Sequence, residues 1–145
     1  MPFFQEWTLS PPTQVGRTRS WHFRAVSHSE IQAYRRTFYL EDRKIIPENI
    51  RALLHSPLSL AVWVMDDGSR DKNALLINTQ AFSSEEHILL MECLWANFGI
   101  EAKLHTDKGK PRIYIPKKSN AKLFELIRSW LIPSVQYKFP CPRND

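Results

Sequence analysis

The sequence is poor in glycine and cysteine, and it has no long hydrophobic run. Its 145 residues include four glycines and two cysteines. Cys93 lies in an apolar stretch and Cys141 lies near the C-terminus, so they indicate neither a disulfide framework nor a set of metal ligands. No apolar segment approaches the length of a membrane span, and the N-terminus lacks a signal-peptide pattern. We therefore expect an intracellular protein without membrane contact.

Several common catalytic signatures are also missing. The sequence has no Gly-rich phosphate loop, no CxxC pair and no nucleophile elbow, which argues against P-loop nucleotide hydrolases, thiol redox enzymes and serine hydrolases. The five histidines show no metal-ligand spacing, and we expect His87 at a helix surface.

What the sequence does contain indicates a folded, basic protein. Hydrophobic residues make up 43% of the chain, with five Trp and eight Phe, which is typical of a globular core rather than disorder. The net charge is +5, which fits a polyanionic partner such as nucleic acid.

The most informative stretch is Ser56–Gly68. It begins with a Ser-Pro pair, a favoured helix start, and Leu58–Met65 is apolar on every side except for one serine. We therefore expect a buried helix that ends at Asp66 and Asp67, with Gly68 as its stop. Anions at a helix C-terminus are unfavourable by about 0.3–1 kcal/mol, so a compensating cation is expected there. A solvated Asp-Asp-Gly turn is the alternative.

Periodicity and capping patterns predict the other elements. Ser83 and Glu86 form a capping box, Gly99 ends the same helix, and Trp95 lies on its predicted core stripe. Residues 69–73 are expected to form a polar turn. The predicted strands are 14–26 (a half-buried strand or hairpin), 74–80, 101–105 and 112–115, and the other predicted helices are 28–40, 48–55 and 119–132. A similar order of strands, helix and lysine occurs in 14–44 and in 101–138, so we divide the chain into a partial domain, 1–46, and a complete one, 47–145.

Leu60–Gly68 resembles the signature helix of the LAGLIDADG homing endonucleases in the divergent form LAxWxMDDG. Further blocks resemble the family and occur in its order: Lys44–Pro47, Ile77–Phe82, Leu131–Pro133 and Tyr137–Pro140. The resemblance implies an α+β fold in which a curved antiparallel sheet, the DNA saddle, is backed by helices. It also implies a site-specific DNA endonuclease that hydrolyses phosphodiester bonds with a divalent metal, Mg²⁺ or Mn²⁺.

The resemblance assigns chemical roles to a few polar residues. Asp67 occupies the position of the metal-binding carboxylate, and its neighbour Asp66 is a second candidate ligand. Basic and polar residues fall where the family places groups near the scissile phosphates, and the candidates for catalysis besides Asp67 are Lys44, Gln80 and Lys138. The alternative for the two lysines is that they are solvated surface residues.

Basic residues alternate along the predicted strands, as expected of a two-stranded ribbon that enters the major groove of double-stranded DNA. The alternative is an ordinary solvated sheet face. The candidates for DNA binding are Arg17, Arg19, His22, Arg24, Asn78, Lys103, His105, Lys108, Lys110 and Arg112.

The chain has one signature motif, whereas the resemblance implies that two such helices pair. Either the Leu58–Met65 helix pairs with another chain, by self-association, or the sequence is a truncated two-motif enzyme. A second hypothesis is a non-catalytic nucleic-acid-binding protein or an intron maturase on the same scaffold, with intron RNA as a partner. The use of arginine and the scarcity of asparagine fit poorly with an AT-rich organellar genome, so we expect a bacterial or mobile-intron origin, with a bacterial cytoplasm favoured over an organelle.

Overall fold

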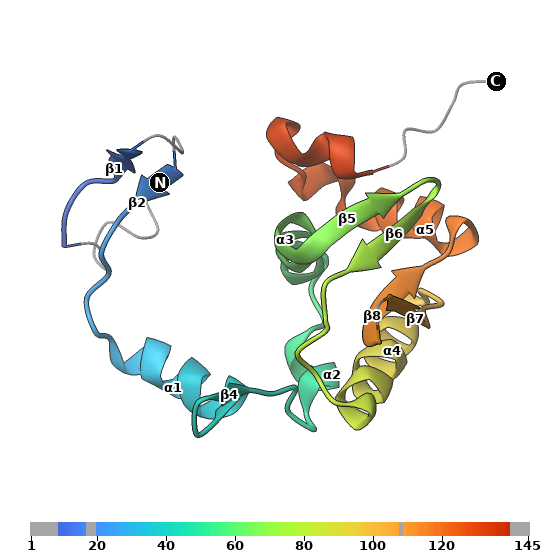
Figure 1. Ribbon diagram of the computed structural model, residues 1–145, viewed down its shortest axis with the longest axis horizontal. Helices are drawn as coiled ribbons and strands as arrows, with labels where there is room; N and C mark the ends of the chain where they lie inside the picture. The colour runs from blue at the N-terminus through green and yellow to red at the C-terminus, as the bar shows by residue number, and fades with distance from the viewer. Residues whose placement is uncertain (1–8, 17–19, 108, 140–145) are drawn as a thin grey trace. The chain divides into compact units, whose positions relative to one another are not determined.

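The computed structural model describes residues 9–16, 20–107 and 109–139, and it divides the chain into two compact units. Unit 1 is Met1–Arg43 and unit 2 is Lys44–Asp145 (Figure 1). In the part of the chain that is described, no helix is both long and apolar enough to cross a membrane.

Unit 1 consists of a strand pair, a helix and part of a second strand pair. β1 (Thr13–Val15) and β2 (Ser20–His22) are antiparallel, as the sequence predicts for this segment. Next come α1 (Ser29–Phe38) and β3 (Tyr39–Leu40), and β3 pairs with β4 (Arg43–Lys44), which spans the boundary between the units.

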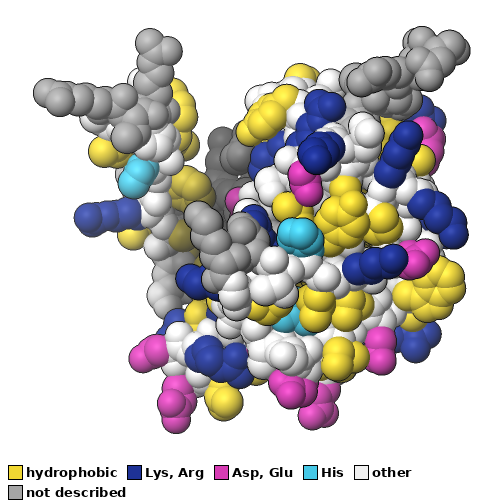
Figure 2. Space-filling model, turned by 45° about the vertical axis from the view of Figure 1, so that its right-hand side comes forward, with side chains coloured by type: hydrophobic (Ala, Val, Ile, Leu, Met, Phe, Trp, Pro, Cys, Tyr) yellow, Lys and Arg dark blue, Asp and Glu magenta, His cyan; other side chains and the backbone are white. Residues whose placement is uncertain are grey.

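Unit 1 has no core of its own among its described residues, none of which is buried. Trp21, Phe23 and Tyr34 keep 65%, 57% and 64% of their surfaces exposed, and Figure 2 shows hydrophobic side chains at the molecular surface. The hairpin is exposed on both faces, so the expectation that it is half-buried is wrong. The physical reason is that no described element of this unit covers either face.

Unit 2 is an α+β domain built on one antiparallel sheet, which confirms the predicted fold class. The sheet order is β5-β6-β8-β7, and every neighbouring pair is antiparallel. The elements are α2 (Ile50–Leu53), α3 (Pro57–Asp67), β5 (Gly68–Asp71), β6 (Ala74–Ile77), α4 (Ser84–Phe98), β7 (Lys103–Asp107), β8 (Lys110–Ile115), α5 (Lys117–Ile127) and two 3-10 turns, Arg128–Trp130 and Pro133–Lys138.

One face of this sheet contributes to the hydrophobic core. Leu75 lies opposite Ile115 and Ile77 lies opposite Ile113 in the β6–β8 ladder, and all four side chains are fully buried. The helices contribute core residues that are at most 2% exposed: Leu60 and Val64 of α3, Leu90 and Leu94 of α4, and Leu123 and Ile127 of α5.

The segment 69–73 is a strand for most of its length. Asp71 lies opposite Ala74, so β5 occupies most of the predicted polar turn and only two residues connect it to β6. β5 is an edge strand of its sheet, and an edge strand tolerates polar side chains because it is covered less completely.

The ends of α4 form as their local sequence predicts. The Ser83 hydroxyl accepts from the Glu86 N–H at 3.2 Å, and the Glu86 carboxylate accepts from the Ser83 N–H at 2.7 Å. Gly99 ends the helix in the left-handed conformation, with φ of 61°. The capping box and the glycine stop are therefore confirmed.

Two expectations about the faces of α4 are wrong. Trp95, expected in the core, is 64% exposed, whereas His87, expected at the surface, is fully buried. His87 can be buried because both ring nitrogens have partners: Nδ1 lies 2.7 Å from the Ser83 carbonyl oxygen and Nε2 lies 3.0 Å from the Thr79 hydroxyl.

Candidate active site and nucleic-acid interface

Helix α3 delivers the predicted acidic residues and is apolar on two opposite faces. The Ser56 hydroxyl accepts from the Leu58 N–H at 3.2 Å, which confirms the predicted N-cap. Leu60 and Val64 are fully buried, but Leu58 and Val62 are 44% and 53% exposed. The helix is therefore buried on one face only, and we call Leu58 and Val62 the α3 stripe.

The end of α3 is fixed by a close backbone approach at Gly68. This glycine has φ of −75°, so it does not adopt the left-handed conformation expected of a helix stop. A Cβ at this position would instead overlap the carbonyl oxygen of Val64. Glycine is required here because the chain turns directly from the helix into β5 without room for a side chain.

Lys138 caps the C-terminus of α3. Its Nζ donates to the Met65 carbonyl at 2.6 Å and to the Asp66 carbonyl at 3.3 Å. The last carbonyls of a helix have no partner within the helix, and a cation at that end is favourable. The adjacent Phe139 anchors this segment, because its ring packs 6.1 Å from the Phe124 ring of α5. Lys138 is thus a cation at the end of the helix dipole, and it contacts the backbone carbonyls there.

Three more of the predicted polar residues meet at this helix end. The Asp67 carbonyl accepts from the Asn78 N–H at 3.0 Å, where the β5–β6 ladder ends. The Asn78 side-chain oxygen accepts from Gln80 Nε2 at 3.4 Å. The structure therefore brings Asp67, Asn78, Gln80 and Lys138 to one end of the sheet, with Asn78 and Gln80 exposed and Asp67 partly buried.

This helix end fits one carboxylate ligand of a divalent metal. Asp66 and Asp67 are consecutive helical residues, so their side chains point about 100° apart and cannot easily share one ion. Within the described residues, no group of three or more His, Cys, Asp or Glu side chains could hold a metal. Mg²⁺ is commonly held by one or two carboxylates together with substrate phosphates. The Asp67 carboxylate therefore suits a metal site whose other ligands would be DNA phosphates and a further carboxylate.

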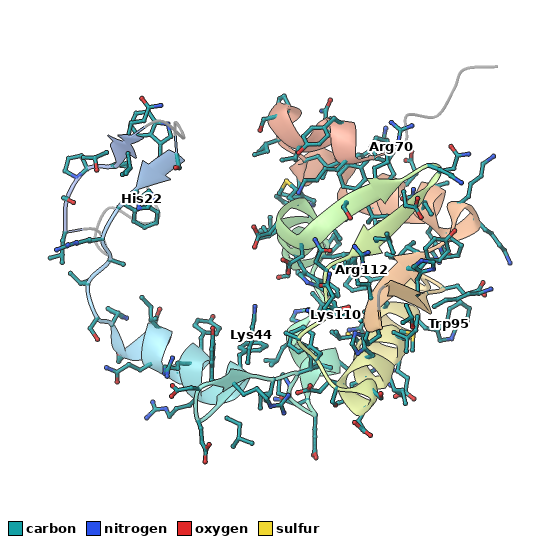
Figure 3. All side chains as sticks on the ribbon, viewed as in Figure 1. His22, Lys44, Arg70, Trp95, Lys110 and Arg112 are labelled. Carbon is teal, nitrogen blue, oxygen red and sulfur yellow. The ribbon has the colours of Figure 1, made fainter. Side chains whose placement is uncertain are left out.

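The sheet face opposite the core carries the predicted basic residues of β7 and β8. Residues opposite each other in an antiparallel ladder share a face, and alternate residues along a strand do too. Lys103 lies opposite Tyr114 and His105 lies opposite Arg112, so these four share one face with Lys110. Arg112 and Lys110 are labelled in Figure 3. We call this side of the sheet the open face.

The open face also carries residues that the sequence argument did not single out. Leu76 lies opposite Tyr114 in the β6–β8 ladder and opposite Ser69 in the β5–β6 ladder. Because Tyr114 is on the open face, Leu76 and Ser69 are on it too. The His105 and Tyr114 rings are 6.0 Å apart. Asp71 lies on the same face at the end of β5, where its charge opposes an anion. Alternation along β8 could have identified Tyr114, but only the strand pairing identifies Ser69.

The remaining candidates are exposed residues or lie outside the part of the chain that the structure describes. Lys44 is exposed in β4, and no described hydrogen bond joins it to α3. His22 and Arg24 are exposed in unit 1. Three candidates lie outside the described residues: Arg17, Arg19 and Lys108.

A partly buried carboxylate at a helix end, beside a sheet whose open face carries several basic residues, is compatible with a nucleic-acid-cleaving enzyme. The family model described as the LAGLIDADG DNA endonuclease family matches residues 1–123. The chain belongs to this family, which confirms the resemblance noted in the sequence.

Named relatives agree with this assignment. A probable intron-encoded DNA endonuclease 3 of Mycosarcoma maydis is 33% identical, over 86% of this chain and 96% of its own length. A probable intron-encoded endonuclease 1 of Wickerhamomyces canadensis is 30% identical over 93% of this chain, which spans only 64% of that relative. Two proteins named as cytochrome b mRNA maturases, from Debaryomyces hansenii and Saccharomyces cerevisiae, also match.

A solved structure has the same fold. It is described as the homing endonuclease I-WcaI bound to its DNA recognition sequence. It is 28% identical to this chain with a TM-score of 0.86, and the match covers 96% of this chain and 68% of that one.

Proposed function

We propose that this protein is a site-specific DNA endonuclease that hydrolyses phosphodiester bonds with the help of a divalent metal, Mg²⁺ or Mn²⁺. The observation that carries the proposal is that one end of unit 2 gathers Asp67, Asn78, Gln80 and Lys138 beside the basic open face. Membership of the family and the DNA-bound relative support the same conclusion.

Double-stranded DNA would lie against the open face. Lys103, Lys110 and Arg112 are positioned along two paired strands, a width that fits the major groove. His105 and Tyr114 add hydrogen-bonding groups between the cations. Affinity would come mainly from phosphate contacts, and it should therefore fall steeply with salt.

The chemistry would take place at the end of α3. The Asp67 carboxylate would hold the divalent metal, which supplies electrostatic stabilisation of the phosphoryl oxygens and an activated water when bound. Lys138 holds the helix end in place and adds positive charge near the scissile phosphate. Gln80 and Asn78 would orient polar groups of the substrate, and Lys44 would provide a second cation.

A second carboxylate must come from outside this helix. We propose that a second copy of the chain supplies it by packing its own α3 against this one. The α3 stripe supports this arrangement, because Leu58 and Val62 form an apolar surface along the helix that ends at Asp67. Contiguous apolar surface can mark a site of protein–protein contact, and pairing of two α3 helices would cover this stripe.

The test starts from duplexes selected from a random library by binding to the full chain. Cleavage of a selected duplex is then measured with Mg²⁺, with Mn²⁺ and with a chelator. Asp67→Asn should abolish cleavage and keep binding, because it removes the metal ligand while preserving the shape of the side chain. Undiminished cleavage by Asp67→Asn would exclude Asp67 from the mechanism.

The alternative is a non-catalytic nucleic-acid-binding protein or an intron maturase. The two relatives named as cytochrome b mRNA maturases support this alternative. Salt-sensitive binding without cleavage under any metal condition would support this alternative. The named endonuclease relatives are intron-encoded, which supports an intron-encoded origin here too. The bacterial source expected from composition stays a prediction.

A further inference from the structure

Unit 1 contains a pocket that the proposed nuclease does not use. It lies where α1 meets the β3–β4 pair, and its volume is about 270 Å³. Its lining residues are Gln32, Arg35, Arg36, Tyr39 and Glu41. The first three occupy one face of α1, because residues three and four apart in a helix are neighbours.

Arg35 and Tyr39 stack on each other and form a platform in this pocket. The Arg35 guanidinium carbon lies 5.1 Å from the centre of the Tyr39 ring, and Arg35 Nη2 lies 3.1 Å from the Asp42 carboxylate. The Tyr39 N–H also donates to the Arg35 carbonyl at the helix end. Arg35 thus lies over the ring, and Tyr39 keeps 37% of its surface exposed. Aromatic rings and guanidinium planes are the surfaces on which unpaired bases stack.

The charges in the pocket distinguish the parts of a nucleotide. Arg36 makes no ion pair with any acidic side chain that the structure describes, so its guanidinium is available for a phosphate. Glu41 would repel a phosphate but can accept hydrogen bonds from the amino group of a base. Gln32 can donate to or accept from a base edge.

From this arrangement we propose that the pocket binds an unpaired nucleotide of single-stranded nucleic acid. The base stacks on the Tyr39 platform, its edge faces Glu41 and Gln32, and its phosphate pairs with Arg36. A nucleotide within a duplex cannot occupy the site, because both faces of its base are already stacked. The proposal is independent of the nuclease, whose duplex DNA is assigned to the open face of unit 2.

The test measures binding of the full chain to unstructured single-stranded RNA, to single-stranded DNA of the same sequence, and to duplex DNA. Tyr39→Ala should weaken single-strand binding roughly 5- to 100-fold, the range for one lost base-stacking contact. Tyr39→Phe should retain binding, because it keeps the ring. Tyr34→Ala is the matched control, since this exposed tyrosine of α1 does not line the pocket.

A second variant tests the phosphate contact. Arg36→Ala should weaken single-strand binding and leave duplex affinity unchanged. The control is Arg128→Ala, which removes the same charge from an exposed arginine in unit 2 and should change neither single-strand nor duplex affinity. A preference for RNA over DNA would identify RNA as the source of the nucleotide, and equal affinity would show that either strand is accepted. The proposal is overturned if Tyr39→Ala and Arg36→Ala bind single strands as well as their controls do.

Discussion

Replacing Lys138 with methionine removes the ammonium group that caps α3 and keeps an unbranched side chain of similar length. The Met65 and Asp66 carbonyls, now 2.6 Å and 3.3 Å from Nζ, lose this donor. A hydrogen bond to a charged group contributes about 1.5–3 kcal/mol, and a cation at a helix C-terminus contributes about 0.3–1 kcal/mol. Lys138 is only partly buried, so water replaces some of the loss. We expect the free energy of unfolding to fall by about 1–2 kcal/mol.

Thermal unfolding followed by circular dichroism measures this loss. For a chain of this size, each kcal/mol corresponds to roughly 2–4 °C, so the midpoint should fall by about 2–8 °C. Lys117→Met is the matched control, because Lys117 is exposed at the start of α5 and makes no described hydrogen bond or ion pair. Lys117→Met should change the free energy of unfolding by no more than about 0.5 kcal/mol.

Two results would refute this account of Lys138. One is an unchanged midpoint in Lys138→Met, and the other is an equal loss in Lys117→Met. Because Lys138 holds the backbone next to Asp67, Lys138→Met should also slow cleavage of the selected duplex without abolishing it. Complete loss of cleavage with an unchanged midpoint would indicate direct chemistry and no capping role.

The remaining predictions concern assembly, DNA affinity and a buried thiol. Val62→Lys should convert a self-associated protein to monomers in multi-angle light scattering, and a wild-type monomer would contradict pairing through α3. Arg112→Ala should weaken duplex DNA binding and reduce the slope of log affinity against log salt by about one, while Arg128→Ala should leave both unchanged. Burial raises the pKa of the Cys93 thiol, so its neutral form is favoured in the folded state, and its contribution to stability should be lost as pH rises above about 9. In a Cys141→Ser background, Cys93 should resist iodoacetamide at neutral pH until the protein unfolds, and rapid alkylation of the native protein would refute this burial.

Signals confined to a few neighbouring residues were sufficient to predict several helix ends. The Ser56 cap and the Ser83–Glu86 capping box are hydrogen bonds between residues two or three positions apart, so the local sequence specifies both partners. The left-handed conformation at Gly99 is likewise a property of one residue. The acidic end of α3 is also local, which is why Asp67 and the family resemblance could be identified in the sequence.

Burial on α4 and α3 could not be predicted in the same way, because apolar residues occur on more than one face of each helix. The face that packs is chosen by the rest of the domain, and this choice left Trp95 and Val62 exposed. His87 could enter the core only because Thr79, which follows β6, offers its hydroxyl. That partner is eight residues away, and periodicity does not detect it.

The sequence by itself determined which residues alternate on β7 and β8 and which helix ends in carboxylates, because both are consequences of backbone periodicity and local capping. Only the tertiary structure decided that Lys138 meets the end of α3, across 73 positions of the chain. It also decided that Ser69 shares the open face with Arg112, through the pairing of β5, β6 and β8. Strand pairing and long-range caps depend on how distant segments pack together, and this packing is a property of the whole fold.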